Sequence, residues 1–235
     1  MTQPASPPHQ TLRVAHVMAG AATGGAELFF ERLCTAQAAS GLSVLPIIRR
    51  EPARAARMQA EGAPPTQLRF GGLLDLATRP RLRSALNTFA PRVTVAWMNR
   101  AARFTPKGPW VLAGRLGGFY DLSYYKRCDH LIGNTHGLVS WMKQEGWPAH
   151  RVHYLPNFAT DLAPTPPHRP AGVPEGAPFV LALARPPTHK PFDSPIRALR
   201  FFPGVSLVLS GQGPERTALV TLAKPERLSS PLLMR

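Results

Sequence analysis

Short, almost continuously apolar runs alternate with stretches of helical periodicity over the first 160 residues. The clearest runs are LRVAHVM (12–18), LSVLPII (42–48), RVTVAWM (92–98) and PWVLAG (109–114). Strands that are apolar on both faces are typical of a parallel sheet that helices cover on both sides. The alternation therefore predicts an α/β fold, with one complete Rossmann-like domain of parallel strands over residues 11–160.

Weaker runs extend the same pattern. TQLRF, CDHLIGNT and RVHYLPN are each interpreted as a strand. Apolar residues recur at helical spacing from Ala26 until Gly41, and the helix predicted over HGLVSWMKQEG ends at Gly146. The stretch 73–89 predicts a helix interrupted near Pro80. The basic segment 49–61 is assigned no element.

The 27 prolines of the chain are concentrated in a few stretches that also mark its organisation. Residues 1–10 are predicted to be a disordered tail, and residues 161–177 a proline-rich linker. PFVLALA and GVSLVLSG then predict strands of a second Rossmann-like domain over residues 178–235. The tail AKPERLSSPLLMR fits neither a strand nor a helix of such a domain, so this second domain is expected to be incomplete.

Charge and cysteine content narrow the class of protein. With 28 basic and 13 acidic residues the net charge is +15, which favours phosphate-bearing partners such as nucleic acid, an anionic membrane or a nucleotide-linked substrate. Cys34 and Cys128 have no metal-binding spacing, and the first ten residues do not resemble a signal peptide. A cytoplasmic protein is expected, with peripheral contact to an anionic inner membrane left open.

Five separated stretches can be interpreted together: LRVAHVMAGAATGGAELFFERL, GGFYDLSYYKRCDHLIGNTHGLVSWM, VHYLPNF, LALARPPTHKPFD and FPGVSLVLSGQGPERTAL. In this order they resemble landmarks of the retaining glycosyltransferases of family 4, whose two Rossmann-like domains form the GT-B fold. The resemblance implies transfer of a sugar from a nucleotide-diphosphate donor to a saccharide or lipid-linked acceptor in cell-envelope glycan biosynthesis. It implies no cofactor and no metal, with the acceptor on the first domain and the donor on the second.

The loop GAATGGAELFFERL (20–33) allows two interpretations. Gly24 and Gly25 permit close approach of the backbone to a ligand, and the following helix presents N–H groups, as in a phosphate or acceptor loop. The alternative is a plain strand-to-helix turn. Glu27 belongs to this candidate loop, although a first-turn acid also complements the helix dipole.

Three residues of the second domain are candidates for donor binding. Arg185 and Lys190 match the basic pair of the family pattern GRLxxxKG, where this chain reads ARPPTHKP, and could hold the diphosphate. Gly213 lies in SGQGPERTAL, which resembles the family turn GxGPxxxxL. Surface charge and ordinary helix-start chemistry are the alternatives.

Two residues are candidates for the catalytic step. Arg115 stands where relatives are expected to have a histidine, and because arginine stays protonated it could bind an acceptor but not act as a base. His136 in GNTHG is the other candidate, with surface exposure as its alternative. Tyr120, Tyr124 and Tyr125 either line a sugar site or pack on the sheet.

The acidic pair that the family carries further along its donor domain has no counterpart here, which predicts a truncated relative and leaves the activity of this chain in question. A non-catalytic remnant or binding module is therefore the alternative function. A nucleic-acid-binding protein is a third, but the sequence has no zinc finger, RNP-like strand or heptad zipper, so no nucleic-acid partner is expected.

Overall fold

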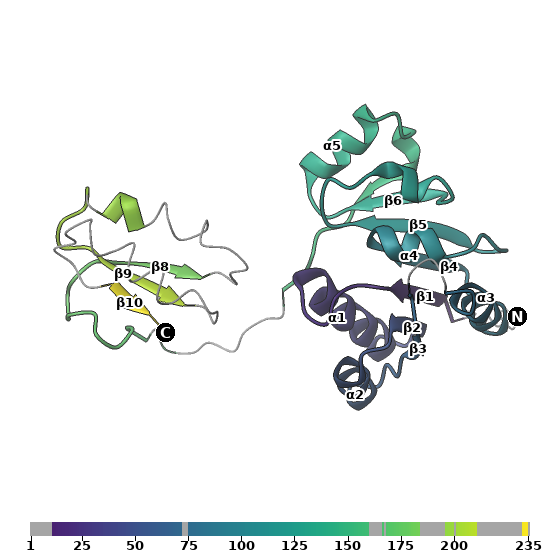
Figure 1. The fold of residues 1–235 in the computed structure, drawn as a ribbon, viewed down its shortest axis with the longest axis horizontal. Coiled ribbons are helices and arrows are strands. Elements are labelled where there is room, and N and C mark those ends of the chain that lie inside the picture. The colour runs from purple at the N-terminus through teal and green to yellow at the C-terminus, as the bar shows by residue number, and fades with distance from the viewer. Residues whose placement is uncertain are drawn as a thin grey trace, which may run out of the picture. The chain divides into compact units, whose positions relative to one another are not determined.

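The computed structural model describes residues 11–71, 75–159, 166, 168–183, 196–199, 201–210 and 232–234. The chain divides into two compact units, Met1–Ala159 and Thr160–Arg235 (Figure 1). The first carries the parallel sheet predicted from the alternating pattern, with helices between its strands, and the second carries a smaller sheet.

The first unit alternates strands and helices along its whole length. Its elements are β1 (Arg13–Met18), α1 (Gly25–Ala39), β2 (Ser43–Arg49), α2 (Pro52–Ala60), β3 (Thr66–Leu68), α3 (Thr78–Phe89), β4 (Val93–Trp97), α4 (Met98–Phe104), β5 (Val111–Leu116), the 3₁₀ turn η1 (Leu122–Tyr125), β6 (His130–Gly133), α5 (His136–Gln144), the 3₁₀ turn η2 (Ala149–Arg151) and β7 (Val152–Tyr154).

The seven strands form one parallel sheet in the order β3-β2-β1-β4-β5-β6-β7 (Figure 1). The order reverses between β1 and β4, because the chain moves outward from β1 to β3 and then returns to place β4 on the other side of β1. This reversal is the topological switch point of a doubly wound sheet. The predicted parallel sheet is thus confirmed.

Two hydrophobic clusters cover the two faces of this sheet. On one face, Phe29, Phe30 and Cys34 of α1 and Met58 of α2 pack with residues of β1, β2 and β4. On the other face, side chains of α3, α4, η1 and α5 pack over the sheet, among them Leu82, Ala101, Tyr125 and Met142. Both faces of the central strands are therefore buried, which explains why these strands are apolar throughout.

Two helices were not predicted from the sequence. The helix α2 lies in the basic segment 49–61; it begins with Pro52 in its first turn and buries Arg54 and Met58, which are four residues apart and so share one face. The short helix α4 follows β4 without a loop and buries Ala101 and Ala102. A segment that buries arginine carries little of the apolar periodicity that marks a helix.

Two predicted boundaries were wrong. Pro80 does not interrupt α3, because it is the third residue of the helix, where a missing N–H group breaks no helical hydrogen bond. Met98 belongs to α4 instead of to the strand that precedes it, and its φ of 61° marks a sharp change of direction at the end of β4.

The second unit contains β8 (Phe179–Leu183), β9 (Ser206–Ser210) and β10 (Leu232–Met234), which form a parallel sheet in the order β10-β9-β8. The expectation that the tail fits no strand was wrong, since residues 232–234 pair with β9. Arg169, from the stretch predicted to be a linker, donates hydrogen bonds to the carbonyls of Pro174 and Ala177 and lies over the Phe179 ring.

Candidate functional site

The candidate site lies at the carboxyl ends of β1, β4 and β5, where the strand order reverses. The chain leaves β1 toward α1 on one face and leaves β4 toward α4 on the other. In open α/β sheets, ligands bind in the crevice that such a divergence creates. Gly24, Gly25, Glu27 and Arg115 all belong to this edge.

Glu27 fixes the loop between β1 and α1 through a backbone N–H group of the loop. Its side chain is buried, and its Oε1 accepts a hydrogen bond of 2.9 Å from the backbone N–H of Ala21. A Cβ atom at Gly20 or Gly24 would lie 2.1 Å from one of the carboxylate oxygens. A larger residue at either position would therefore displace this carboxylate from its place under the loop. Gly24 has a φ of 171°, an extended conformation open to any residue, so its backbone alone does not demand glycine.

Gly25 is in a different situation from Gly24. A Cβ atom at this position would meet nothing within 4 Å. Gly25 is the first residue of α1 and faces open space at the helix N-terminus. Of the two glycines in the motif, Gly24 serves the packing of Glu27, whereas Gly25 leaves the surface of the loop uncovered.

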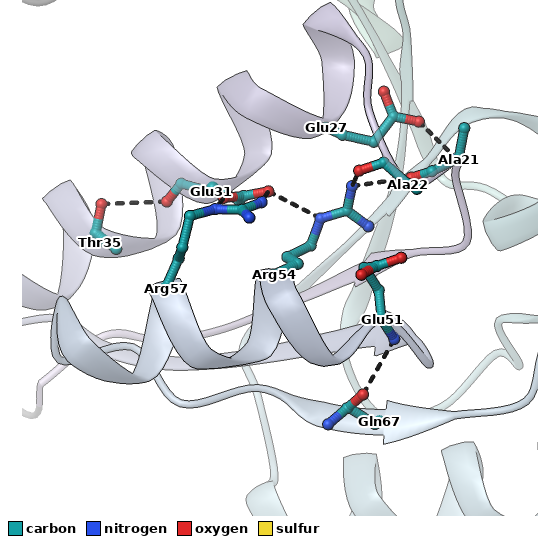
Figure 2. A network of polar contacts seen from close by, with 9 residues as sticks. All are labelled: Ala21, Ala22, Glu27, Glu31, Thr35, Glu51, Arg54, Arg57 and Gln67. Atoms are coloured by element: carbon teal, nitrogen blue, oxygen red, sulfur yellow. Dashed lines mark hydrogen bonds and ion pairs between the residues drawn. The ribbon is translucent and has the colours of Figure 1, made fainter.

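Arg54 holds the same loop from the side of α2. Its guanidinium, 1% exposed, donates from Nε to Oε1 of Glu31 at 2.9 Å and from Nη2 to the carbonyl oxygens of Ala21 and Ala22, each at 2.9 Å. Figure 2 shows Arg54 and Arg57 extending from α2 toward Glu31 on α1. The loop backbone is thus fixed by a carboxylate on its N–H group and by a guanidinium on its carbonyls.

Arg115 is a buried cation at the end of β5. Its guanidinium lies 4.9 Å from the ring centroid of Phe29 and 5.0 Å from that of Trp97. It donates hydrogen bonds to the carbonyl of Leu155 (3.1 Å) and to Oδ1 of Asn157 (2.7 Å). In the described part of the chain no carboxylate forms an ion pair with it.

Burial lowers the pKa of Arg115 to about 10, so the side chain stays charged at neutral pH. Carbonyl and amide dipoles and aromatic faces stabilise its charge but do not neutralise it. Arg115 therefore gives the switch point a fixed positive potential and also ties the segment after β7 to β5.

His16 is a buried histidine in β1 that the sequence did not single out. Nδ1 accepts a hydrogen bond from Nε1 of Trp97 (3.2 Å), and Nε2 lies 2.7 Å from Oε1 of Gln37. Because Trp97 can only donate, the proton of the neutral ring is assigned to Nε2. Burial, together with the smaller effect of the nearby charge of Arg115, lowers the pKa of His16 to about 4, although the hydrogen bond with Gln37 opposes the shift. The histidine holds Trp97 against Arg115; its signal in the sequence is a lone polar residue within an apolar strand.

A small cavity of about 260 Å³ opens beside this loop at the carboxyl ends of β1 and β2. It is lined by Gly20, Ala21, Ala22, Arg49, Arg50, Glu51 and Arg54. Arg49 and Arg50 are exposed there, in contrast to the buried Arg54. One side of the loop is therefore hydrogen-bonded to Glu27 and Arg54, and the other side lines a cavity that also contains the exposed Arg49 and Arg50.

The remaining predicted residues lie elsewhere. His136 is the exposed first residue of α5, with its ring stacked on Tyr154 at a centroid distance of 3.8 Å. Tyr125 is buried and donates to Asn99, so it packs on the sheet, while Tyr124 is 38% exposed. Arg185, Lys190 and Gly213 lie outside the described residues.

Metal ligands and membrane spans were sought in the described residues. No three His, Cys, Asp or Glu side chains of that part of the chain come together as metal ligands. Within the same ranges, no helix combines the length and the apolarity that a bilayer crossing requires.

The fold is α/β and GT-B-like. The glycosyltransferase from Rickettsia africae ESF-5 superposes with a TM-score of 0.73 at 10% identity, covering 97% of this chain and 69% of that one. Anabaena Alr3699/HepE, crystallised with UDP and glucose, gives a TM-score of 0.65 at 16% identity, with 95% and 69% covered. At such identities the likeness concerns the fold alone.

Two relatives resemble the chain in sequence, although no protein-family model matches it. The lipopolysaccharide core biosynthesis glycosyltransferase LpsE of Rhizobium meliloti (strain 1021) is 33% identical over 219 residues, which are 90% of this chain and 63% of LpsE. LpsD of the same strain is 31% identical over 218 residues, 90% of this chain and 62% of LpsD. The chain thus spans less than two thirds of the length of either relative.

The contact between Gly24 and Glu27 predicts opposite outcomes for two neighbouring substitutions. Gly24→Ala displaces the Glu27 carboxylate from the N–H of Ala21 and should lower the free energy of unfolding by about 1–3 kcal/mol. Gly25→Ala, its matched control, has open space and should not destabilise. Urea unfolding measures both. If the contact is the cause, Gly24→Ala becomes nearly neutral when Glu27 is already alanine; an undiminished cost in that background contradicts it.

The burial of neutral His16 predicts a loss of stability in acid. With a pKa of about 4 in the folded state and about 6.5 when unfolded, stability is fully present above pH 6.5 and falls as the pH drops toward 4, by about 3 kcal/mol for this group. Unfolding free energies of wild type and His16→Gln between pH 7 and 4 measure this, and the variant should show a shallower decline. The exposed His136→Gln is the control. Parallel profiles for wild type and His16→Gln would refute the assignment.

Proposed function

We propose that this chain acts in the synthesis of the lipopolysaccharide core as a retaining glycosyltransferase of family 4. The observation that carries the proposal is the 33% identity to LpsE over 219 residues, a length that includes parts of both compact units. The order of the family-like motifs along the chain supports it independently. The donor is a nucleotide-diphosphate sugar, and the acceptor is a saccharide or a lipid-linked saccharide.

The donor diphosphate is assigned to Arg185 and Lys190, with the backbone at Gly213 approaching the nucleotide. This assignment rests on the sequence pattern and on the fold, because Alr3699/HepE has been crystallised with UDP and with UDP-glucose. A departing diphosphate gains negative charge, and cations already in place lower the barrier to its departure.

The loop with Gly24 and Gly25 is assigned to the acceptor instead of to a phosphate. An anion at the N-terminus of α1 would approach the buried carboxylate of Glu27, and the N–H of Ala21 is already bonded to that carboxylate. Like charges at short range repel, which opposes phosphate binding at this point. A neutral sugar hydroxyl meets no such penalty beside the open face at Gly25.

The transfer breaks the bond between the anomeric carbon and the diphosphate oxygen, forms a bond to an acceptor oxygen and releases the hydroxyl proton. Arg115 does not accept this proton, because its pKa of about 10 keeps it charged at neutral pH. It acts instead through its charge and by holding the end of β5. His136 is exposed and is the candidate that remains for a proton-accepting role.

Calorimetric titration with UDP-glucose tests the donor assignment. The double substitution Arg185→Ala/Lys190→Ala should raise the Kd about tenfold or more, because it removes two charge-assisted contacts to the diphosphate. Lys143→Ala/Arg151→Ala removes two exposed cations from the first unit and should leave the Kd unchanged. EDTA should have no effect.

Absence of saturable binding by the wild type, or equal weakening in both double variants, contradicts the donor assignment. Release of glucose or its transfer to an acceptor, followed by NMR, decides between enzyme and binding module. An α-linked product from UDP-α-glucose supports retention.

A further inference from the structure

A second and larger cavity lies on the face of the sheet that α3 and α4 cover. Its volume is about 790 Å³, within the range of small-molecule sites. It is lined by Gly71 and Asp75 after β3, by Leu76, Arg79 and Pro80 at the start of α3, by Asn99, Arg100, Arg103 and Phe104 of α4, and by Tyr124 of η1. None of these residues belongs to the candidate site described above.

The cavity carries an excess of positive charge. Arg79, Arg100 and Arg103 line it and are exposed, and no described carboxylate forms an ion pair with any of them. Arg79 is positioned by a hydrogen bond of 3.3 Å to the carbonyl of Arg103 and lies 5.7 Å from the Phe104 ring centroid. The side chains of Arg100 and Arg103 form no hydrogen bond with a described residue.

The acid in this lining, Asp75, is fully engaged within its own turn. Its carboxylate accepts hydrogen bonds from the hydroxyl and the N–H of Thr78 and from the N–H of Gly71. The Thr78 hydroxyl and the Gly71 N–H lower its pKa to about 2. Through its bond to the N–H of Thr78, the first residue of α3, Asp75 also caps that helix. It does not neutralise the arginines by contact.

Aromatic and amide groups stand beside the cations. Phe104 and the 38% exposed Tyr124 present ring surface to the cavity. Oδ1 of Asn99 accepts a hydrogen bond of 2.9 Å from the hydroxyl of Tyr125. The amide N–H groups of Asn99 are therefore the donors that it can offer to a ligand. Guanidinium groups match carboxylates and phosphates, and aromatic faces match the C–H faces of sugars.

Two residues with strained backbone conformations each precede a residue of the cavity lining. Phe70 (φ 44°) precedes Gly71, and Met98 (φ 61°) precedes Asn99. Non-glycine residues are unfavourable in this region of φ, and such residues concentrate where a site needs a fixed backbone. Gly71 and Asn99, the residues that directly follow these two, both line the cavity.

We propose that this cavity binds an acidic sugar, one that carries a phosphate or carboxylate group, as part of the acceptor. Arg100 and Arg103 hold the anionic group, Asn99 donates to a hydroxyl, and Tyr124 and Phe104 contact the ring. That the sugar belongs to an acceptor rests on the proposed glycosyltransferase function; that the cavity selects an anionic sugar rests on its own residues. Specificity for an acidic core sugar would follow from it.

The inference is tested by NMR titration of the full 235-residue chain with glucose 6-phosphate and with glucuronic acid, against glucose and inorganic phosphate. The acidic sugars should shift backbone amides of residues 75–79 and 98–104. They should bind about tenfold or more tighter than glucose or free phosphate, because anion and ring are recognised together. The stronger of the two identifies phosphate or carboxylate as the group that is recognised.

Arg100→Gln/Arg103→Gln should weaken binding of the acidic sugar about tenfold or more. Arg81→Gln/Arg83→Gln removes two exposed cations from α3 outside the cavity lining and should leave it unchanged. Equal loss in both variants, or phosphate binding as tightly as the phosphorylated sugar, overturns the inference. So does binding of phosphatidylglycerol vesicles that depends on Arg100 and Arg103 when acidic sugars do not bind.

The UDP-glucose affinity of Arg100→Gln/Arg103→Gln separates the two proposals. It should equal that of the wild type. Selective acidic-sugar binding by a chain that does not bind UDP-glucose supports the cavity assignment and contradicts the enzyme. UDP-glucose binding without acidic-sugar binding supports the enzyme and contradicts the cavity assignment.

Discussion

The geometry of the switch point depends on the hydrogen bonds that the buried guanidinium of Arg54 donates. Desolvating a guanidinium costs several kcal/mol unless its charge and N–H groups are satisfied. Here Glu31 and the carbonyls of Ala21 and Ala22 satisfy it, so a residue of α2 joins α1 to the loop after β1 (Figure 2). Glu27 completes the arrangement through the N–H of Ala21. A loop whose backbone is fixed in this way offers a ligand a preorganised surface.

The two faces of the sheet offer different chemistry at its carboxyl edge. On the α1 face, the polar groups of the loop are bound internally and Phe29 and Trp97 enclose Arg115, so this face has a fixed surface and a positive potential. On the α4 face, Arg100 and Arg103 are exposed and have no acidic partner among the described residues. The acceptor that we propose has neutral hydroxyls near the α1 face and an anionic group near the α4 face.

The sequence was sufficient to predict the sheet but not the polar contacts at its edge. Apolar runs such as residues 12–18 and 109–114 identify buried strands because both faces must be covered, and Gly41 and Gly146 end α1 and α5 as expected. The helix α2 was missed because its buried face carries Arg54, whose partners lie more than twenty residues away in sequence. β10 was missed because three residues become a strand only when β9 is beside them.

For the candidate site residues too, the sequence was sufficient to recognise the motif but not the contacts that explain it. The motif at Gly24 and Gly25 was recognised, but the reason for Gly24 is the position of the Glu27 carboxylate in space, which no spacing rule contains. Arg115 was singled out through a resemblance, whereas its contacts with Leu155 and Asn157 depend on the pairing of β5, β6 and β7.

Amide hydrogen exchange at Ala21 in the unliganded protein is the most direct measurement of whether this loop is preorganised. We predict slow exchange, comparable to the amides of β1, and exchange about tenfold or more faster in Glu27→Gln, whose weaker acceptor no longer holds the N–H. Exchange of Ala21 at the rate of an unprotected amide in the wild type would contradict the account, because the surface proposed for the acceptor would then be mobile before any ligand binds.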